Sequence, residues 1–249
     1  MGELEGKVAL VTGAGQNIGR AIALELARAS ASIVVNGRRN RDLVDRVVEE
    51  VAGAGGQAMG VMADVSDRRA VDDMIHRVAE RFGGVDILVS NAGLRRQTPL
   101  LNMQFDEWRE ILAVALDGAF LLARAAVPRM IDRGGGAIIA ISGISPHVGT
   151  PNRCHVSAAK AGLEGFVRAL AVELAPRNIT CNCIAPGAID TVRGETAGGT
   201  PSNIRREQIP LGRKGRVEEI AAMVRFLAGP QATYVTGQTI HVNGGAYLA

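Results

Sequence analysis

The sequence predicts an α/β protein, with a doubly wound parallel sheet covered by helices on both faces, in a single domain over residues 1–249. Short, nearly continuous apolar runs alternate with segments whose apolar residues recur at helical spacing. A glycine-rich turn follows the first apolar run directly, as in dinucleotide-binding sheets. No linker or internal repeat interrupts this alternation, so a single domain is expected.

The apolar runs are short enough for buried strands and end at glycine or polar residues. The strands are expected over residues 7–12, 32–36, 57–62, 85–90, 136–142, 178–185 and 238–243.

The segments between these runs have the spacing of amphipathic helices, and the crossovers are expected to be right-handed. The helices are expected over residues 18–30, 42–51, 69–81, 111–130, 157–174 and 217–228, with a short separate segment around Trp108. The stretch 186–210 is rich in Gly, Thr and Pro and has no clear period, which is typical of a functional loop such as a substrate lid.

Composition excludes several classes of function. The net charge is only +3 and no basic block stands out, which argues against nucleic-acid binding. The start lacks a secretion leader, and no apolar run reaches membrane-spanning length, so no membrane association is expected. Cys154, Cys181 and Cys183 form no disulfide framework and no metal-ligand pattern, so we expect a cytoplasmic protein without a metal.

The glycine-rich turn is the strongest local motif. In TGAGQNIGR, Gly13, Gly15 and Gly19 lie between the first strand and the first helix. Backbone N–H groups at such a helix N-terminus stabilise a pyrophosphate. The spacing does not fit G-x-G-x-x-G. It resembles T-G-x-x-x-G-x-G, the signature of the short-chain dehydrogenases/reductases, with Asn17 in place of the middle glycine. Asparagine tolerates left-handed backbone, so the turn is expected to form.

The resemblance extends over essentially the whole chain and is greatest to the β-ketoacyl-carrier-protein reductase and glucose dehydrogenase group. It implies a Rossmann-type fold and an oxidoreductase that acts on a small-molecule substrate. It also implies a homotetramer in which the helices over 111–130 and 157–174 pack against neighbouring copies.

The same resemblance implies a set of cofactor-binding residues. Asp64 in MADVSD matches the aspartate that hydrogen-bonds the adenine, SNAG matches the family's N-N-A-G, and APGAIDT matches its P-G-x-x-x-T, in which Thr191 would hold the nicotinamide amide. The full set is Gly13, Gly15, Asn17, Ile18, Gly19, Arg38, Arg39, Asp64, Val65, Asn91, Ala92, Gly93, Lys160, Pro186, Gly187, Ile189 and Thr191.

The choice of cofactor depends on the end of the second strand, IVVNGRRN. An acidic residue there would bind the ribose hydroxyls of NAD(H), whereas arginine accommodates the 2′-phosphate of NADP(H). Gly37 occupies the acidic position and is followed by Arg38 and Arg39. A guanidinium binds phosphate well, so NADP(H) is predicted rather than NAD(H).

The catalytic positions depart from the family. Lys160 matches the family's lysine, but the tyrosine that donates the proton is replaced by Val156, four residues earlier. The serine position, thirteen residues before that, is Gly143, and the asparagine of the long helix is Ala115. A general acid typically contributes ~10²–10⁴ in rate, so catalysis is expected to be weak or atypical.

Two histidines are candidate substitutes for the tyrosine. His155 adjoins Val156 and His147 lies in the preceding loop, and imidazole has a pKa suited to proton transfer. In a helix, His155 points about 100° away from the face that carries Val156 and Lys160, so a partly exposed histidine at a helix start is the simpler interpretation.

Three functions follow from these residues. The first is an NADP(H)-dependent oxidoreductase with a non-standard site built on Lys160, with His155 as a candidate acid. It would act on an activated alkene, an imine or a carbonyl, with water as proton donor. The second is an inactive NADP(H)-binding protein that regulates or supports an oligomer. The third is a non-redox activity that uses His155 or His147.

Overall fold

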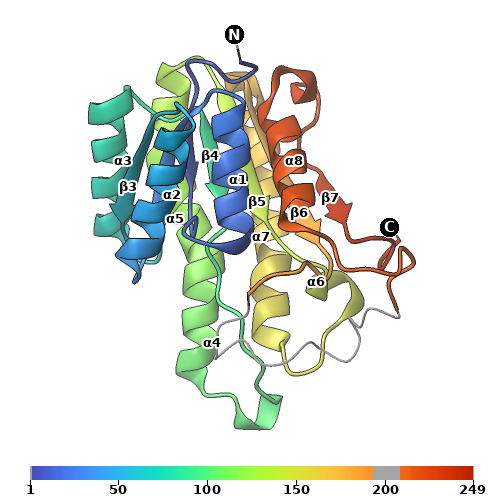
Figure 1. The fold of residues 1–249 in the computed structure, drawn as a ribbon. Helices are drawn as coiled ribbons and strands as arrows, with labels where there is room; N and C mark the ends of the chain where they lie inside the picture. Colours follow the sequence, from blue (N-terminus) through green and yellow to red (C-terminus); the bar gives the residue numbers. More distant parts are fainter. Residues whose placement is uncertain (1, 193–207, 249) are drawn as a thin grey trace.

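The protein forms one seven-stranded sheet between two layers of helices (Figure 1). This structure, a computed structural model, describes residues 2–192 and 208–248. All paired strands are parallel, in the order β3-β2-β1-β4-β5-β6-β7. The strands are β1 (Val8–Val11), β2 (Ser32–Gly37), β3 (Ala58–Met62), β4 (Ile87–Ser90), β5 (Gly136–Ile141), β6 (Ile179–Pro186) and β7 (Thr239–Val242).

Two apolar cores join the helices to the two faces of the sheet. In β1, Ala9 and Val11 enter one core while Val8 and Leu10 enter the other, because successive side chains of a strand point to opposite faces. The first core is completed by α1 (Asn17–Arg28), α2 (Arg41–Gly53) and α8 (Val217–Ala228). The second is completed by α3 (Arg68–Phe82), α5 (Gly118–Asp132) and α7 (Cys154–Leu174). The predicted fold class is therefore confirmed.

The long central helix differs from the prediction. The segment around Trp108 is not separate, because α4 (Phe105–Leu112) continues through η2 (Ala113–Asp117), a π-helical stretch, into α5. The periodicity of the sequence does not show this continuity because the π-helical stretch shifts the apolar face in its middle.

The combined helix over residues 105–132 also corrects the expectation about apolar runs. It is 28 residues long and contains a window of mean hydropathy 1.8, so length and composition alone would let it cross a membrane. Nearly half of that window is buried inside the fold, and Leu122, Ala126 and Met130 pack in the second core. It is therefore a core helix of this fold.

The order of the strands places a crevice at one end of the sheet. β1 and β4 are neighbours, yet the chain leaves β1 toward β2 on one side and β4 toward β5 on the other. In doubly wound sheets, ligands bind outside the carboxyl ends of the strands at such a switch point. The loops that follow β1, β2, β4, β5 and β6 meet there.

Candidate functional site

The turn after β1 has the close packing that the glycines predict. Gly13 has φ +61°, in the left-handed region. A side chain at Gly19 would collide with Gly13 O and would lie 2.6 Å from Asn91 Nδ2, so only glycine fits there. Gly15 lies close to α2, and the side chain of Ile18 is buried in the first core, so Ile18 can offer a cofactor only its backbone. The glycines therefore let β1, α1 and the loop after β4 pack closely, and the N-terminus of α1 follows directly, where backbone N–H groups can stabilise a pyrophosphate.

Asn17 confirms the expectation about its backbone and adds an unpredicted contact. Its φ of +52° is left-handed. Its side chain also forms a reciprocal pair with the backbone of Val192: Val192 N donates to Asn17 Oδ1 at 2.9 Å, and Asn17 Nδ2 donates to Val192 O at 3.0 Å. Asn17 therefore joins the start of α1 to the segment that follows β6.

The loops after β1 and β4 are hydrogen-bonded to each other through Thr12 and Asn91. The backbone N–H groups of Asn91 and Ala92 donate to Thr12 Oγ1 at 3.0 and 3.1 Å, and Asn91 Nδ2 donates to Thr12 O at 2.8 Å. These bonds leave Gly93 exposed at the edge of the crevice, where an added Cβ would lie 3.6 Å from Lys160 Nζ.

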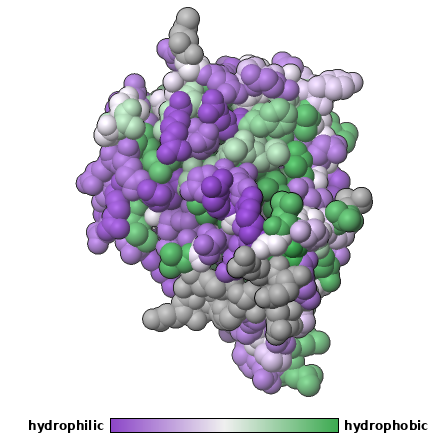
Figure 2. Space-filling model, turned by 45° about the vertical axis from the view of Figure 1, so that its right-hand side comes forward, coloured by the Kyte–Doolittle hydropathy of each residue, from purple (hydrophilic) through white to green (hydrophobic). Residues whose placement is uncertain are grey.

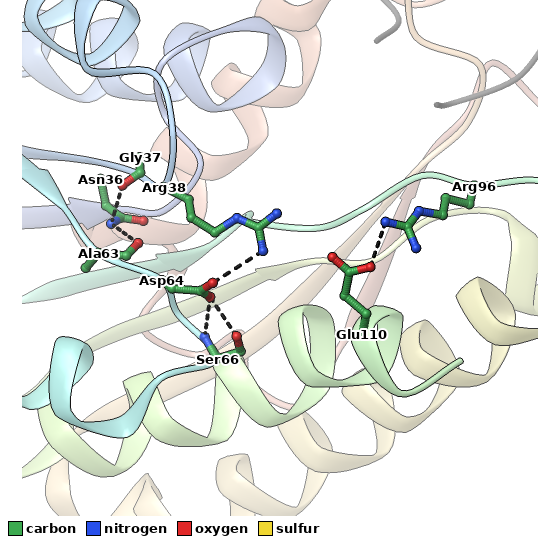
Figure 3. A network of polar contacts seen from close by, with 8 residues as sticks. All are labelled: Asn36, Gly37, Arg38, Ala63, Asp64, Ser66, Arg96 and Glu110. Atoms are coloured by element: carbon green, nitrogen blue, oxygen red, sulfur yellow. Dashed lines mark hydrogen bonds and ion pairs between the residues drawn. The ribbon is translucent and has the colours of Figure 1, made fainter. Parts of the chain in front are cut away.

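Arg38 and Asp64 face each other across the ends of β2 and β3 (Figure 3). Arg38 Nη1 donates to Asp64 Oδ2 at 3.3 Å, and Asp64 Oδ1 accepts from the N–H and Oγ of Ser66. Burial opposes ionisation of Asp64, but the bonds from Ser66 and the Arg38 cation outweigh it and lower the pKa of this carboxyl. A cavity of about 150 Å³ lies beside this pair, lined by Gly13, Asn36, Arg38, Asp64, Ala92 and Val114 among others.

The structure gives a steric reason for the missing acidic residue. An added Cβ at Gly37 would lie 2.5 Å from Val44 Cγ2, so any side chain there needs α2 to move. Asn36 Nδ2 donates to Ala63 O at 3.1 Å, which joins the ends of β2 and β3 (Figure 3). Arg39 is exposed next to Asn40, whose side chain caps α2. This end of the sheet therefore presents two cations and no carboxylate at the position that would exclude a 2′-phosphate.

The end of β6 closes the crevice from the other side. Gly187 lies against Asn243, since an added Cβ would be 2.7 Å from Asn243 Cα, and Pro186 ends the paired part of the strand. Thr191 Oγ1 accepts from Arg95 Nη1 at 3.2 Å. The predicted lid, 186–210, is described only as far as residue 192 and from residue 208 onward, and the rest lies outside the described residues.

The predicted cofactor residues thus lie in or beside the loops after β1, β2, β3, β4 and β6 and, for Lys160, on α7, and those of the first four loops include residues that line the crevice. Val65 differs from most residues of this set because its side chain is buried against Gly118. Ile189 pairs with Gly215 in an isolated bridge. Glycines at close approaches, cations beside β2 and polar groups at the ends of β1, β4 and β6 fit a phosphorylated dinucleotide such as NADP(H).

Lys160 lies at the centre of the catalytic positions. Its Nζ donates to Ile141 O, at the end of β5, at 2.6 Å. Burial, together with the Arg95 cation, lowers the pKa of Lys160 from 10.5 to about 8, while Glu164 opposes the shift. A proton-exchanging amine near neutral pH is thus available at the site.

Two of the positions expected for the family's catalytic groups lie in an apolar cluster. Ala115 is buried in a small cluster with Ile111 and Ala159, and Val156 and Leu94 pack against it. Gly143 is different, because an added Cβ there would meet nothing within 4 Å. The apolar cluster therefore supplies no side-chain proton donor.

His155 is fully buried, which corrects the expectation of a partly exposed histidine. Its Nε2 is hydrogen-bonded to Glu107 Oε1 at 3.1 Å, and Glu107 also accepts from Thr98 Oγ1 at 2.6 Å. The bond from Thr98, together with that from His155, lowers the pKa of Glu107 against the effect of burial. His155 joins the starts of α4 and α7, and its role as an acid stays a prediction.

Glu164 is a site residue that the sequence did not indicate. It is buried on α7, one turn after Lys160, and Oε1 accepts from Ser142 Oγ at 2.5 Å and pairs with His147 Nε2 at 3.0 Å. Its position on an apolar helix, four residues from the lysine, is the only signal that sequence carries.

The other chemical groups of the fold lie away from this crevice or are inert. Burial raises the pKa of Cys181 and of Cys183 to about 12, so both stay thiols, as predicted. Within the described ranges, no group of His, Cys, Asp and Glu residues is placed to hold a metal. A larger cavity of about 570 Å³ lies at the amino ends of the strands, around Lys7, Asp86 and Arg133, away from the glycine-rich turn.

Comparison with known proteins identifies the family of this chain. Residues 13–247 match a family model described as "Enoyl-(Acyl carrier protein) reductase". The chain is 41% identical, over the full length of both proteins, to a 3-oxoacyl-[acyl-carrier-protein] reductase of Synechocystis sp.. It is 40% identical to the 3-oxoacyl-[acyl-carrier-protein] reductase FabG of Staphylococcus aureus, covering 97% of this chain and 98% of that protein, and 39% identical to FabG of Salmonella typhimurium, covering 98% of each. Together with the crevice of this chain, these similarities identify NADP(H) as the cofactor. The chain belongs to the short-chain dehydrogenase/reductase family, among the 3-oxoacyl-[acyl-carrier-protein] reductase-like members.

Proposed function

We propose that this protein is an NADP(H)-dependent reductase of an activated double bond whose site works without a tyrosine, serine or asparagine. One observation carries the proposal: the loops after β1, β2, β3 and β4 line one crevice, while Val156, one turn before Lys160, packs with Ala115 and Ile111 in an apolar cluster. Bound NADPH supplies a hydride. What the chain itself supplies is the orientation of the substrate, the exclusion of water and the Lys160 ammonium.

The type of double bond that accepts the hydride is inferred from the catalytic groups that the site lacks. Reduction of a ketone places charge on one oxygen and needs a proton donor in the transition state. Addition to a C=C bond conjugated with a carbonyl spreads the charge over the conjugated system, so a strong protein acid matters less. The substrate class we favour is an α,β-unsaturated acyl thioester. The enoyl reductase of the matched family model and the 3-oxoacyl reductases that resemble this chain support an acyl thioester.

A matched pair of substrates tests this proposal. Crotonyl-N-acetylcysteamine and acetoacetyl-N-acetylcysteamine share the carrier and differ in the acceptor, C=C against C=O. We expect NADPH to be consumed at least about tenfold faster with the crotonyl thioester, since loss of a general acid costs ~10²–10⁴ for the carbonyl. A cyclic imine and a simple ketone complete the panel, and NADH replaces NADPH as the control for cofactor choice.

An inactive NADP(H)-binding protein is the second candidate, favoured by the same apolar cluster. Binding of NADPH, followed by its fluorescence, without consumption against the whole panel would replace our proposal with this one. A non-redox activity of His155 or His147 has less support, because the relatives that match this chain over nearly its whole length are reductases.

We also infer a homotetramer assembled through the helices over 111–130 and 157–174, and a cytoplasmic location. Phe120 on α5 and Val172 on α7 are exposed apolar residues, which supports contact through these two helices. The similarity to acyl-carrier-protein reductases over the whole chain supports both inferences.

A further inference from the structure

The apolar cluster beside Val156, between α4 and α7, cannot carry a proton. Ile111, Ala115 and Ala159 are buried there, and Leu94 and Leu112 pack against them. His155 adjoins Val156 but is turned about 100° from the helix face that carries Val156 and Lys160, and it is held by Glu107. A proton that replaces one given up by Lys160 is therefore expected from another side of the helix.

Glu164 lies on that other side. Lys160 and Glu164 are one turn apart on α7, so they share a helix face. Both reach the carboxyl end of β5 at consecutive residues: Lys160 Nζ donates to Ile141 O at 2.6 Å, and Ser142 Oγ donates to Glu164 Oε1 at 2.5 Å. The carboxylate is therefore a near neighbour of the ammonium, which the opposing effect of Glu164 on the pKa of Lys160 reflects.

His147 connects Glu164 with less buried parts of the fold. Its Nε2 is 3.0 Å from Glu164 Oε1. Its ring lies 4.5 Å from that of His241 on β7 and 5.1 Å from that of Tyr247 near the C-terminus, measured between centroids. All three rings are only partly buried, whereas Glu164 is buried. The His147 imidazole therefore links the buried Glu164 carboxylate to rings that lie nearer the surface.

We propose that Lys160 is itself the proton donor of the reaction, and that Glu164 and His147 return the proton to it. The inference rests on the proposed function. In each turnover, one N–H bond of the Lys160 ammonium breaks and the proton goes to the substrate atom that gains charge in the reduction. The neutral amine then takes a proton from the Glu164–His147 pair, and His147 regains one from water. These residues exchange protons only and are neither oxidised nor reduced.

The charges around the pair are consistent with this role. An ordinary lysine is too weak an acid to donate efficiently at neutral pH, whereas a lysine with a pKa of about 8 is suited to it. Arg95 favours loss of the proton and Glu164 favours its return. Cys183 on β6 remains a thiol. The other titratable or charged groups that act on this site are His147, Arg168 and His241.

The small number of lysines allows a direct test that does not depend on turnover. The chain contains three lysines, Lys7, Lys160 and Lys214. Protein labelled with ¹³C at lysine Cε and titrated by NMR should show one signal with a midpoint near pH 8, assigned by its loss in Lys160→Met. In Glu164→Gln the midpoint should fall by about 1 unit, because an opposite charge nearby is removed. Glu173→Gln, at an exposed position of the same helix, is the matched control and should leave it unchanged.

The second readout is the pH dependence of NADPH consumption with crotonyl-N-acetylcysteamine. The acid form of Lys160 is required, so the rate should fall as the pH rises through about 8. In Glu164→Gln, the pH at which the rate falls should be lower by the same amount as the midpoint of the Lys160 titration, about 1 unit. His147→Gln, at a partly exposed position that leaves the carboxylate in place, should lower kcat on the order of tenfold and enlarge the solvent isotope effect.

The outcomes separate the inference from the proposed function. If NADPH is consumed but the Lys160 signal and the pH profile are the same in Glu164→Gln as in the parent, the inference is overturned and the proposed function stands. If NADPH binds and no member of the substrate panel is reduced, the proposed function fails and Lys160 has no donor role. A parallel shift of the titration and of the pH profile supports the inference.

Discussion

At the scale of single residues, the positions of Val156 and Gly143 differ in how easily a larger side chain would fit. Val156 is partly buried and packs against the apolar cluster around Ala115, so its replacement has neighbours to displace. Gly143 has open space where a side chain would begin. The position expected for the family's serine therefore has room for a side chain, whereas the position expected for its tyrosine packs against an apolar cluster.

The double change Val156→Tyr with Gly143→Ser should restore ketone reduction. It introduces a phenol one turn from Lys160, and the serine hydroxyl can hold the substrate oxygen. We expect the rate of NADPH consumption with acetoacetyl-N-acetylcysteamine to rise on the order of 10²-fold, the contribution of a general acid. Val156→Phe with Gly143→Ser is the control, since it adds nearly the same volume without the hydroxyl. An equal gain in this control would show that the shape of the pocket, and not the acid, limits the parent.

At the scale of elements, Asn17 couples the glycine-rich turn to the segment after β6. The two hydrogen bonds between Asn17 and Val192 join positions 175 residues apart. Thr191, the expected partner of the nicotinamide amide, immediately precedes Val192, so the contact holds the residue next to Thr191 against the start of α1.

Substitutions of Asn17 should separate this contact from the geometry of the turn. Asn17→Gly tolerates the φ of +52° but loses both hydrogen bonds, so NADPH affinity in a fluorescence titration should fall about tenfold with thermal stability nearly unchanged. Asn17→Ala should lose the same affinity and also about 1 kcal/mol of stability, because alanine is strained in left-handed backbone. Unchanged affinity in Asn17→Gly would mean that the contact with Val192 does not contribute to cofactor binding.

At the scale of the whole molecule, two sets of exposed apolar side chains bear on assembly. Phe120 and Val172, 46% and 81% exposed, lie on the helices expected at the oligomer interface. Leu100, Leu101 and Phe105 form a second group at the tip of the molecule, where the start of α4 projects at the bottom of Figure 1 and apolar surface is visible at the bottom of Figure 2.

Light scattering should report four copies of the 26.1 kDa chain at micromolar concentration. Phe120→Glu combined with Val172→Glu should reduce this mass, because buried unpaired charges oppose association. Leu101→Glu, at the projecting tip, is the control and should leave the mass unchanged. A parent protein that scatters as a monomer would contradict the tetramer.

Much of this protein follows from the sequence alone, because apolar periodicity and glycine placement are local properties. They determined the parallel sheet, the glycine-rich turn after β1 and the left-handed Asn17, and they predict that three catalytic positions are replaced. The bounds of the strands agree with the prediction within two residues, since a buried strand must be apolar along its length. The continuity of α4 with α5 was missed because a π-helical stretch interrupts the regular period.

Only the tertiary structure decided which polar side chains meet. Glu164 lies in an apolar helix and acquires a role only where β5, α6 (Ser145–Val148) and β7 bring Ser142, His147 and His241 around it. His155 looked exposed at a helix start, and packing of α4 against α7 buries it on Glu107. Such partners lie far apart along the chain, so no local pattern encodes them. Their pairing arises because a polar group buried by the fold has to find a hydrogen-bond partner wherever the packing places one.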